Sequence, residues 1–328
     1  MKIGFVSPYF YPEMVGGIEW YLFHVTRLLQ KSGHQVTVFA TRSANTSAQS
    51  SVDGSQIEGV SVVRIPTLID LTYRLKIWPR LAKHLKDADL DVLHVFDYAQ
   101  FHVLASILSS KGARWRSVVT VYDIHSQIPR GSVKGLPMAI FDRYFAGKVL
   151  SNFERILVRT PFQAEFVADL GLGREKVKLT PPGIDPIHFE DPPQEEVERA
   201  RDLYSPSGEP MVLYVGRLHP IKGIDVLFRS AKILKDRGIN VKVVVVGPDA
   251  HGYRSDLEDL ARRLGIDDQV AFTGFVDERQ KWILQSACDV AVLPSSFEGF
   301  GQSLAQAMAR GKPVIGTDVG GIPWVLED

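Results

Sequence analysis

The sequence predicts an α/β protein made of two doubly wound domains, and three observations carry this prediction. Short, apolar, β-branched segments alternate with helical segments, which is typical of a parallel sheet with helices on both faces. The alternation starts again after the turn cluster Pro181-Pro-Gly183. The 328 residues suffice for two domains of ordinary size. We therefore expect doubly wound domains at residues 1–182 and 183–328.

The first half supplies one set of alternating elements. The expected strands are Ile3–Ser7, Gln35–Ala40, Val60–Ile65, Val92–Phe96, Val118–Val121 and Ile156–Val158. The expected helices are Ile18–Lys31 and Phe101–Ser109. Because the strands are short and apolar on both sides, we expect them to lie in the interior of a parallel sheet.

The second half supplies a second set. The acidic, proline-containing stretch Asp191–Arg201 predicts a surface connection that leads into a helix. The expected strands are Met211–Val215, Val241–Val246, Val270–Thr273, Val290–Leu293 and Val314–Thr317, and the expected helices are Asp225–Arg237 and Tyr253–Leu264. After Gly320-Gly321 we expect neither a closing strand nor a final helix, so the domain is predicted to be incomplete at its C-terminus.

Charge is unevenly divided between the halves. Residues 1–180 hold 22 Lys and Arg against 15 Asp and Glu, whereas residues 181–328 hold 16 against 23. This asymmetry predicts either an anionic partner for the first half, such as a phospholipid surface or a phosphorylated acceptor, or complementarity between the two domains. No nucleic-acid partner is expected.

The single cysteine, Cys288, cannot form an internal disulfide, which favours a reducing compartment. It is interpreted as a small core residue. Neither a signal peptide nor an apolar run of about 20 residues is present. We expect a cytoplasmic protein that contacts a membrane only at its surface.

The most informative loop follows the strand Val290–Leu293. It carries Glu298, and Gly299 and Gly301 then open a helix. In open α/β sheets, ligands bind outside the carboxyl ends of the strands, and a helix N-terminus offers free N–H groups to an anion. The loop suits a polyhydroxylated, negatively charged ligand such as a nucleotide sugar, and an ordinary strand-to-helix loop with a solvated glutamate is the alternative.

Two further loops are suited to phosphate. Arg217 and Lys222 follow the strand Met211–Val215 and precede a helix, so they predict a diphosphate site. Gly16 and Gly17 follow the first strand and precede a helix; they fit a phosphate cradle or a flexible connection.

Two other strand ends carry weaker signals. Gly274-Phe275-Val276 fits the border of a nucleobase, or Phe275 belongs to the core. Asp123 and His125, in Thr120-Val-Tyr-Asp-Ile-His125, are candidates for acid/base or substrate-orienting work, or they are surface residues.

Four of these motifs occur in the order and spacing of the retaining glycosyltransferases of family 4, which the whole chain resembles. The motifs are Gly16-Gly17-Ile-Glu19, Val215-Gly-Arg-Leu with Lys222-Gly223, Phe272-Thr-Gly-Phe-Val276 and Ser296-Phe-Glu-Gly-Phe-Gly301. The resemblance implies the GT-B fold, in which two Rossmann-like domains face each other across a cleft. It also implies transfer of a sugar from a nucleotide diphosphate sugar to an acceptor hydroxyl, without a metal or other cofactor.

The resemblance assigns a role to each motif. Arg217 and Lys222 would neutralise the donor diphosphate, and Gly16 and Gly17 would close over it. Glu298, with backbone groups of Phe300 and Gly301, would hold the sugar hydroxyls. Gln306 would hold the ribose, while Phe275 and Val276 would border the base. Asp123 and His125 stay candidates for catalysis beside Glu298.

The chain departs from the family pattern at two positions. Gln306 stands where the family has a second glutamate, and Tyr122 stands where it commonly has a histidine. With the expected incomplete C-terminus, these departures keep an alternative open: a non-catalytic subunit that binds nucleotide or a second chain that completes the fold. Related GT-B epimerases and phosphorylases fit the motif order less well.

The acceptor is predicted only by class. The segments Leu71–Lys86 and Arg130–Lys148 mix basic and bulky apolar residues, as interfacial helices do. Either they lie on an anionic membrane surface, or their apolar faces pack in the core. With the basic first half, they favour a lipid-linked or phosphorylated acceptor, such as a glycan precursor.

Overall fold

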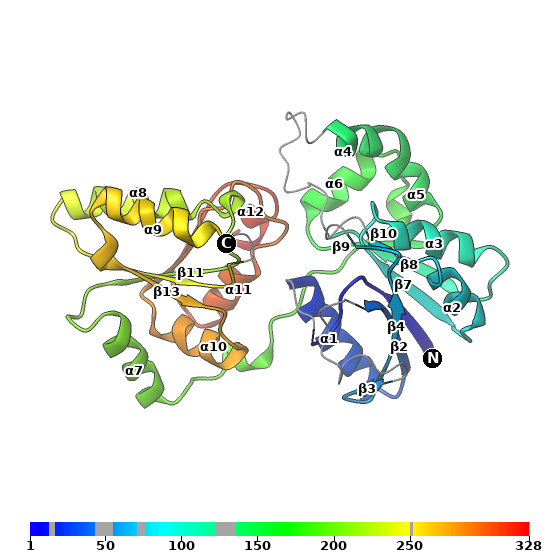
Figure 1. Cartoon of the computed structure of the whole chain (residues 1–328), viewed down its shortest axis with the longest axis horizontal. Coiled ribbons are helices and arrows are strands. Elements are labelled where there is room, and N and C mark those ends of the chain that lie inside the picture. Colours follow the sequence, from blue (N-terminus) through cyan, green and yellow to red (C-terminus); the bar gives the residue numbers. More distant parts are fainter. Residues whose placement is uncertain (13–16, 43–54, 71–75, 123–135, 250–251, 328) are drawn as a thin grey trace. The chain divides into compact units, whose positions relative to one another are not determined.

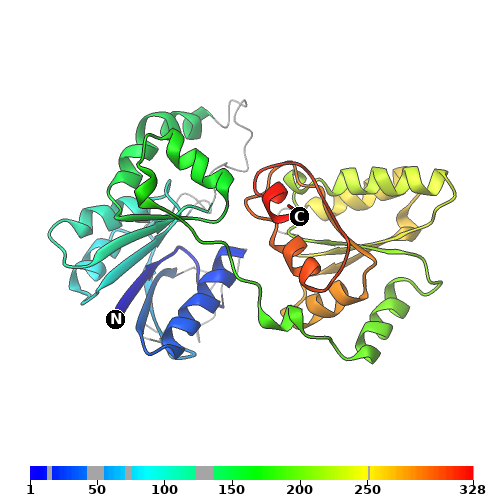
Figure 2. The same cartoon turned by 180° about the vertical axis from the view of Figure 1, so that it is seen from behind.

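The computed structural model describes residues 1–12, 17–42, 55–70, 76–122, 136–249 and 252–327. It contains two compact units, Met1–Pro181 and Pro182–Asp328. Each unit has helices on both faces of a sheet (Figures 1 and 2). The units meet one residue before the boundary that the turn cluster predicts.

Unit 1 is built on an eight-stranded sheet in the order β10-β9-β8-β7-β1-β2-β4-β3. Neighbouring strands are parallel except β3, which runs antiparallel to β4. The strands are β1 (Lys2–Val6), β2 (Gln35–Arg42), β3 (Ser55–Ile57), β4 (Val60–Pro66), β7 (Val92–Phe96), β8 (Arg116–Thr120), β9 (Arg155–Val158) and β10 (Val177–Leu179). Strands β5 (Ile69–Asp70) and β6 (Lys76–Ile77) form a separate antiparallel pair.

Side chains on opposite faces of the unit 1 sheet belong to two separate hydrophobic cores. Phe5 packs with Leu22 and Phe23 of α1, whereas its neighbour Val6 belongs to the core that contains α2 and α3. Successive strand residues point to opposite faces, so an apolar strand needs helices on both sides. The helices of unit 1 are α1 (Gly17–Lys31), α2 (Leu81–Asp87), α3 (Phe101–Ser110), α4 (Leu136–Phe141), the π-helix η2 (Asp142–Ala146), α5 (Gly147–Ser151) and α6 (Pro161–Asp169).

A buried arginine holds the loop that follows β1. Arg64 lies on β4 and is 1% exposed. Its guanidinium donates hydrogen bonds to the carbonyl oxygens of Phe10 and Tyr11, at 2.9 and 2.6 Å. The Thr41 hydroxyl donates to the Pro8 carbonyl oxygen of the same loop, at 2.6 Å. The chain between β1 and α1 is thus anchored to the neighbouring strands by side chains.

Unit 2 has a five-stranded parallel sheet in the order β13-β12-β11-β14-β15. The strands are β11 (Met211–Val215), β12 (Lys242–Val246), β13 (Val270–Gly274), β14 (Val290–Leu293) and β15 (Val314–Gly316). The α-helices are α7 (Gln194–Tyr204), α8 (Ile224–Asp236), α9 (Tyr253–Leu264), α10 (Glu278–Ala287), α11 (Gln302–Ala309) and α12 (Ile322–Val325), and short 3₁₀ turns include η4 (Pro186–Phe189) and η5 (Pro220–Lys222).

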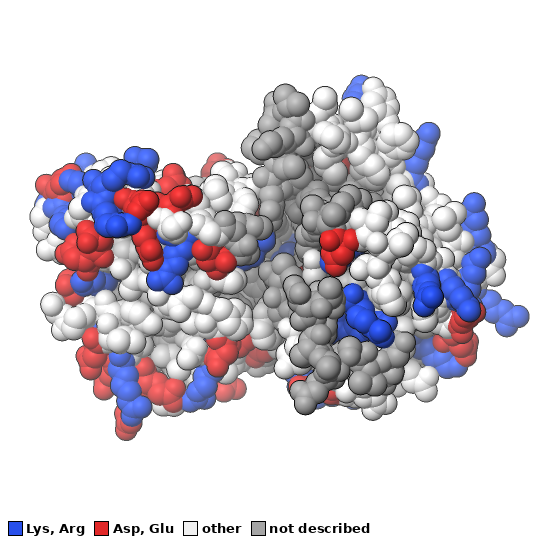
Figure 3. All heavy atoms as spheres, in the orientation of Figure 1, with Lys and Arg blue, Asp and Glu red and all other residues white. Residues whose placement is uncertain are grey.

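The same alternation organises unit 2. Val212 and Tyr214 of β11 pack in the core formed with α8 and α9. Met211 and Leu213, the intervening residues, pack in the core formed with α10. The sheet is therefore doubly wound, and the carboxyl ends of its parallel strands share one edge. The outer surface of unit 2 carries cations and anions interspersed (Figure 3).

The strand boundaries expected from the sequence agree with the structure for most strands. Three other expectations need correction. The stretch interpreted as a surface connection is largely the helix α7. The turn α12 follows Gly320-Gly321, so the expectation that no helix follows is wrong. Phe275 is 64% exposed, which excludes it from the core.

We expect the substitution Arg64→Met to lower the free energy of unfolding of unit 1 by about 2–4 kcal/mol, because it leaves buried carbonyl oxygens without donors. Urea unfolding of the full chain measures this loss. The matched control, Arg116→Met, changes a side chain that is 79% exposed and should shift stability by less than about 0.5 kcal/mol. Equal effects of the two substitutions would contradict the anchoring role of Arg64.

Candidate functional site

Three loops meet at the carboxyl edge of the unit 2 sheet. The first joins β11 to α8 and begins where the Gly216 N–H donates to the Val246 carbonyl oxygen at 2.9 Å. The Tyr214 hydroxyl donates to the Arg217 carbonyl oxygen at 2.9 Å and fixes the turn. These contacts hold the loop that carries Arg217 and Lys222 against the ends of β11 and β12.

Glycine lets the first loop touch the loop after β14. Gly223 has φ +65°, and a Cβ there would lie 2.0 Å from the Pro294 carbonyl oxygen. Only glycine fits such an approach in that conformation. Ser296 completes the junction, since its N–H and its hydroxyl both donate to the Ile221 carbonyl oxygen, at 2.8 and 3.0 Å.

An ion pair crosses this junction. The Lys222 ammonium donates to Glu298 Oε2 at 2.6 Å, and the two side chains are only 16% and 19% exposed. Glu298 Oε1 accepts from the Gly299 N–H at 3.2 Å. Charges removed from water attract each other more strongly than exposed charges, so this pair orders both loops.

The third loop, after β15, supports Glu298 from behind. The Gly321 N–H donates to the Glu298 carbonyl oxygen at 2.9 Å. Gly320 has φ +57°, and a Cβ there would lie 2.1 Å from the same oxygen. Gly301, with φ +86°, then caps α11. The glutamate is therefore fixed by its backbone as well as by its side chain.

The buried phenol of Tyr214 lies near Glu298, and its pKa is shifted. Burial, and next the negative charge of Glu298, raises the pKa of the Tyr214 phenol far above its usual value. The raised pKa keeps the phenol protonated near neutral pH, which suits its role as hydrogen-bond donor to the Arg217 carbonyl oxygen.

The other predicted residues of unit 2 are placed differently from one another. Arg217 is partly buried in the first loop. Phe275 projects from the loop after β13, while Val276 packs against the core. Phe300 is buried, and the centre of its ring lies 6.2 Å from that of Trp324.

Gln306 lies inside unit 2. Its side chain is 5% exposed, and its Oε1 is 3.5 Å from Nε2 of Gln285 on α10. Gln285 also donates to the Ser303 carbonyl oxygen at 3.3 Å. The structure thus joins Gln306 to a buried pair of amides between α10 and α11.

The predicted residues of unit 1 are only partly covered. Gly17 opens α1, whereas Gly16, Asp123 and His125 lie outside the described residues. Tyr122 is 5% exposed in an aromatic cluster with Phe96 and Tyr21.

The sequence analysis did not single out Arg159 as a neighbour of Tyr122. Its guanidinium lies 4.5 Å from the centre of the Tyr122 ring. Arg159 directly follows β9, and its place after a strand was the available signal.

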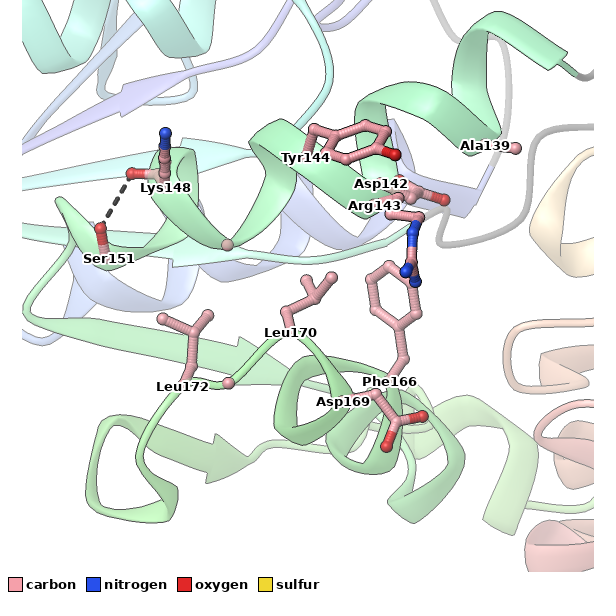
Figure 4. A pocket seen from close by; sticks show the side chains of 12 residues that line it. Ala139, Asp142, Arg143, Tyr144, Lys148, Ser151, Phe166, Asp169, Leu170 and Leu172 are labelled. Atoms are coloured by element: carbon pink, nitrogen blue, oxygen red, sulfur yellow. Dashed lines mark hydrogen bonds between the residues drawn. The ribbon is translucent and has the colours of Figure 1, made fainter.

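A separate groove of about 640 Å³ lies in unit 1, between the segment α4–η2–α5 and the end of α6 (Figure 4). None of the residues predicted for phosphate or sugar binding lines it. The groove and the loop junction of unit 2 are therefore distinct features.

Two family models together match most of the chain. Residues 15–187 match the family described as Glycosyltransferase Family 4, and residues 197–328 match Glycosyl transferases group 1. The chain belongs to glycosyltransferase family 4. The sequence-based recognition of this family is confirmed.

Similar proteins include an uncharacterized glycosyltransferase of Methanocaldococcus jannaschii, 29% identical, with 100% of this chain and 83% of the relative covered. A D-inositol 3-phosphate glycosyltransferase of Nocardia farcinica is 28% identical over 95% of this chain and 72% of its own length. A phosphatidyl-myo-inositol mannosyltransferase of Mycolicibacterium smegmatis is 27% identical over 100% and 79%.

Solved structures show the fold. HepE of Anabaena, in complex with UDP and glucose, has a TM-score of 0.77 at 22% identity, with 100% of this chain and 83% of that chain covered. Sucrose-phosphate synthase of Thermosynechococcus elongatus has a TM-score of 0.76 at 21% identity, with 98% and 84% covered. The glycosyltransferase has the GT-B fold, as the sequence predicts.

We expect a double-mutant cycle on Lys222→Gln and Glu298→Gln to give a coupling energy of about 1–3 kcal/mol in unfolding free energy, because the pair is largely shielded from water. Chemical denaturation of the four proteins measures it.

The matched control is the pair Arg254–Glu258, whose side chains are 46% and 43% exposed. Its cycle should give less than about 0.5 kcal/mol. A coupling at Lys222–Glu298 no larger than this control would contradict the ordering role of the pair.

Proposed function

We propose that this glycosyltransferase moves a sugar, with retention of anomeric configuration, from a nucleotide diphosphate sugar to an acceptor hydroxyl. The observation that carries the proposal is the Lys222–Glu298 pair at the loop junction of unit 2. It sets a cation for phosphate beside a carboxylate for sugar hydroxyls, at the edge where α/β sheets bind ligands. That the related HepE was solved with UDP and glucose supports a donor of this class.

A bound donor would interact with both Lys222 and Glu298. Its diphosphate would draw Lys222 away from Glu298, with Arg217 as a second cation. The released Glu298 carboxylate would accept hydrogen bonds from the sugar hydroxyls. Backbone N–H groups of Phe300 and Gly301 would assist at the start of α11. Ribose contact by Gln306 requires a change in its packing against Gln285.

The chemical step exchanges one bond at the anomeric carbon for another. The bond from this carbon to the diphosphate oxygen breaks, and a bond to the acceptor oxygen forms on the same face. The acceptor proton passes to the leaving phosphate oxygen. Arg217 and Lys222 stabilise the negative charge that develops on the diphosphate, which is the main protein contribution to such a transfer. Among the described residues no group of His, Cys, Asp and Glu could hold a metal, and we propose metal-independent transfer.

We propose a phosphorylated or lipid-linked acceptor and a cytoplasmic enzyme at a membrane surface. The basic first half supports an anionic acceptor. The relatives from Nocardia and Mycolicibacterium bear names that specify an inositol phosphate and a phosphatidylinositol. No described helix has the length and apolarity needed to span a bilayer.

A non-catalytic role is the second candidate, and two observations favour it. Tyr122 is part of an aromatic core cluster, and Gln306 is buried against Gln285. Both stand at positions where the sequence departs from the family pattern. This candidate retains nucleotide binding and lacks transfer, so turnover measurements separate it from the first.

Turnover of UDP-, GDP- and ADP-sugars, followed by nucleotide release, tests the proposal. One donor class should be consumed, and Lys222→Gln or Glu298→Gln should lower kcat/KM about 100-fold or more. The control Lys232→Gln, at an exposed ion pair of α8, should leave kcat/KM unchanged. Nucleotide binding without turnover of any donor would support the non-catalytic candidate instead, and NMR of the new anomeric centre decides retention.

A further inference from the structure

A helical segment of unit 1 is apolar on two faces. The segment runs without a break through α4, η2 and α5, residues 136–151. Its inner face packs in the main core through Met138, Phe141, Val149 and Leu150. Its outer face leaves four large apolar residues exposed, namely Leu136 (56%), Ile140 (46%), Tyr144 (62%) and Phe145 (53%). Helices with apolar residues all round are normally buried, so the outer face suits an apolar environment.

The four exposed residues form one ridge. Leu136, Ile140 and Tyr144 are spaced four apart, and such residues share a helix face. Phe145 is exposed next to Tyr144, and its ring stacks on that of Phe141 with 6.2 Å between the ring centres. We call these four residues the outer ridge.

The groove of unit 1 touches the outer ridge at Tyr144 (Figure 4). Ala139, Arg143, Tyr144 and Lys148 line one wall. Phe166, Leu170 and Leu172 line the other wall. The groove has a volume of about 640 Å³, and its lining mixes apolar side chains with charged and polar ones, including Asp142, Ser151 and Asp169.

The charges beside the ridge are mainly positive. Arg143 and Lys148 are both exposed, and the Arg143 guanidinium lies 5.9 Å from the centre of the Tyr144 ring. Asp142 also lines the groove, but it is buried and accepts a hydrogen bond from the Tyr98 hydroxyl at 2.8 Å. Asp169, on the far wall, is the exposed carboxylate of the groove. Around α4 the surface of unit 1 is mostly uncharged (Figure 3).

We infer that the outer ridge docks on an anionic phospholipid bilayer, with Arg143 and Lys148 at the headgroups. An apolar ridge flanked by cations is the pattern of a helix that lies in a membrane interface. The excess of Lys and Arg in the first half adds long-range attraction. The inference deepens the proposed function, on which it rests for the lipid-linked acceptor.

The other segment that the sequence singled out as interfacial, Leu71–Lys86, does not share this arrangement. In its described part, residues 76–86, the side chains of Trp78, Leu81 and Leu85 are buried in the core. The interfacial interpretation is therefore wrong for that part, and the core alternative is right. Of the two segments that the sequence singled out, only Arg130–Lys148 carries such a ridge in its described residues, which begin at Leu136.

Sedimentation with vesicles tests the inference, using the full chain without any donor. One vesicle contains equal parts phosphatidylglycerol and phosphatidylcholine, and the other contains phosphatidylcholine alone. The chain should bind the anionic vesicle. Each cation near such a surface contributes roughly fivefold in partition, so the double variant Arg143→Gln/Lys148→Gln should bind about 30-fold more weakly. The double variant Tyr144→Ser/Phe145→Ser should lose roughly tenfold or more.

Two matched variants serve as controls. Leu104→Ser/Leu108→Ser removes an exposed apolar pair from α3, where the residues are 50% and 60% exposed. Arg116→Gln/Lys178→Gln removes two exposed cations elsewhere in unit 1. Both should bind anionic vesicles within about twofold of the unchanged chain, and thermal melting checks that all variants fold.

Failure to bind anionic vesicles would overturn the inference, as would equal losses in the ridge variants and the controls. Self-association that the ridge variants abolish, without vesicle binding, would assign the ridge to a second copy of the chain. Because no donor is present, failure here leaves the proposed sugar transfer standing, and loss of turnover leaves vesicle binding standing.

Discussion

The ion pair between Lys222 and Glu298 is the interaction on which the proposed donor site depends. It joins loops that follow different strands. These loops can lie so close together because Gly223 and Gly320 have no Cβ; a Cβ at either position would lie 2.0 or 2.1 Å from a carbonyl oxygen of the loop after β14. The loop junction therefore consists of rigid backbone contacts around two opposite charges. In the proposed reaction the backbone contacts would stay in place, while the two side chains exchange each other for the diphosphate and the sugar hydroxyls of the donor.

The two units contribute differently to this account. Unit 2 holds the ion pair and the glycines that frame it. Unit 1 contributes the anchored loop after β1, with Arg64 as its fastening, and the outer ridge. If the ridge lies on a bilayer, unit 1 selects where the reaction takes place while unit 2 selects the donor. This division matches the uneven charge of the two halves.

Strand and helix alternation was sufficient to predict the doubly wound fold, because an apolar strand such as β11 is buried on both faces and requires helices on both sides of the sheet. The strand β10 was missed since it has three residues, none of them buried. Helix α7 begins earlier than the sequence indicates; no residue in it is buried, so the sequence carries no strong apolar periodicity that would mark its start. At the site, Lys222 and Glu298 were identified singly from their places after strands. Their pairing was not, because it depends on a contact between loops far apart in the chain. The burial of Gln306 against Gln285 escaped prediction for the same reason.

Calorimetric titration of the full chain with UDP, GDP and ADP tests the central claim most directly, using the diphosphate that binds best. The account predicts opposite effects of the two substitutions. Lys222→Gln should weaken binding at least about tenfold, since a charge-assisted hydrogen bond to phosphate is lost. Glu298→Gln should strengthen it, because the carboxylate no longer competes for Lys222. Equal weakening by both substitutions, or no change with either, would contradict the account.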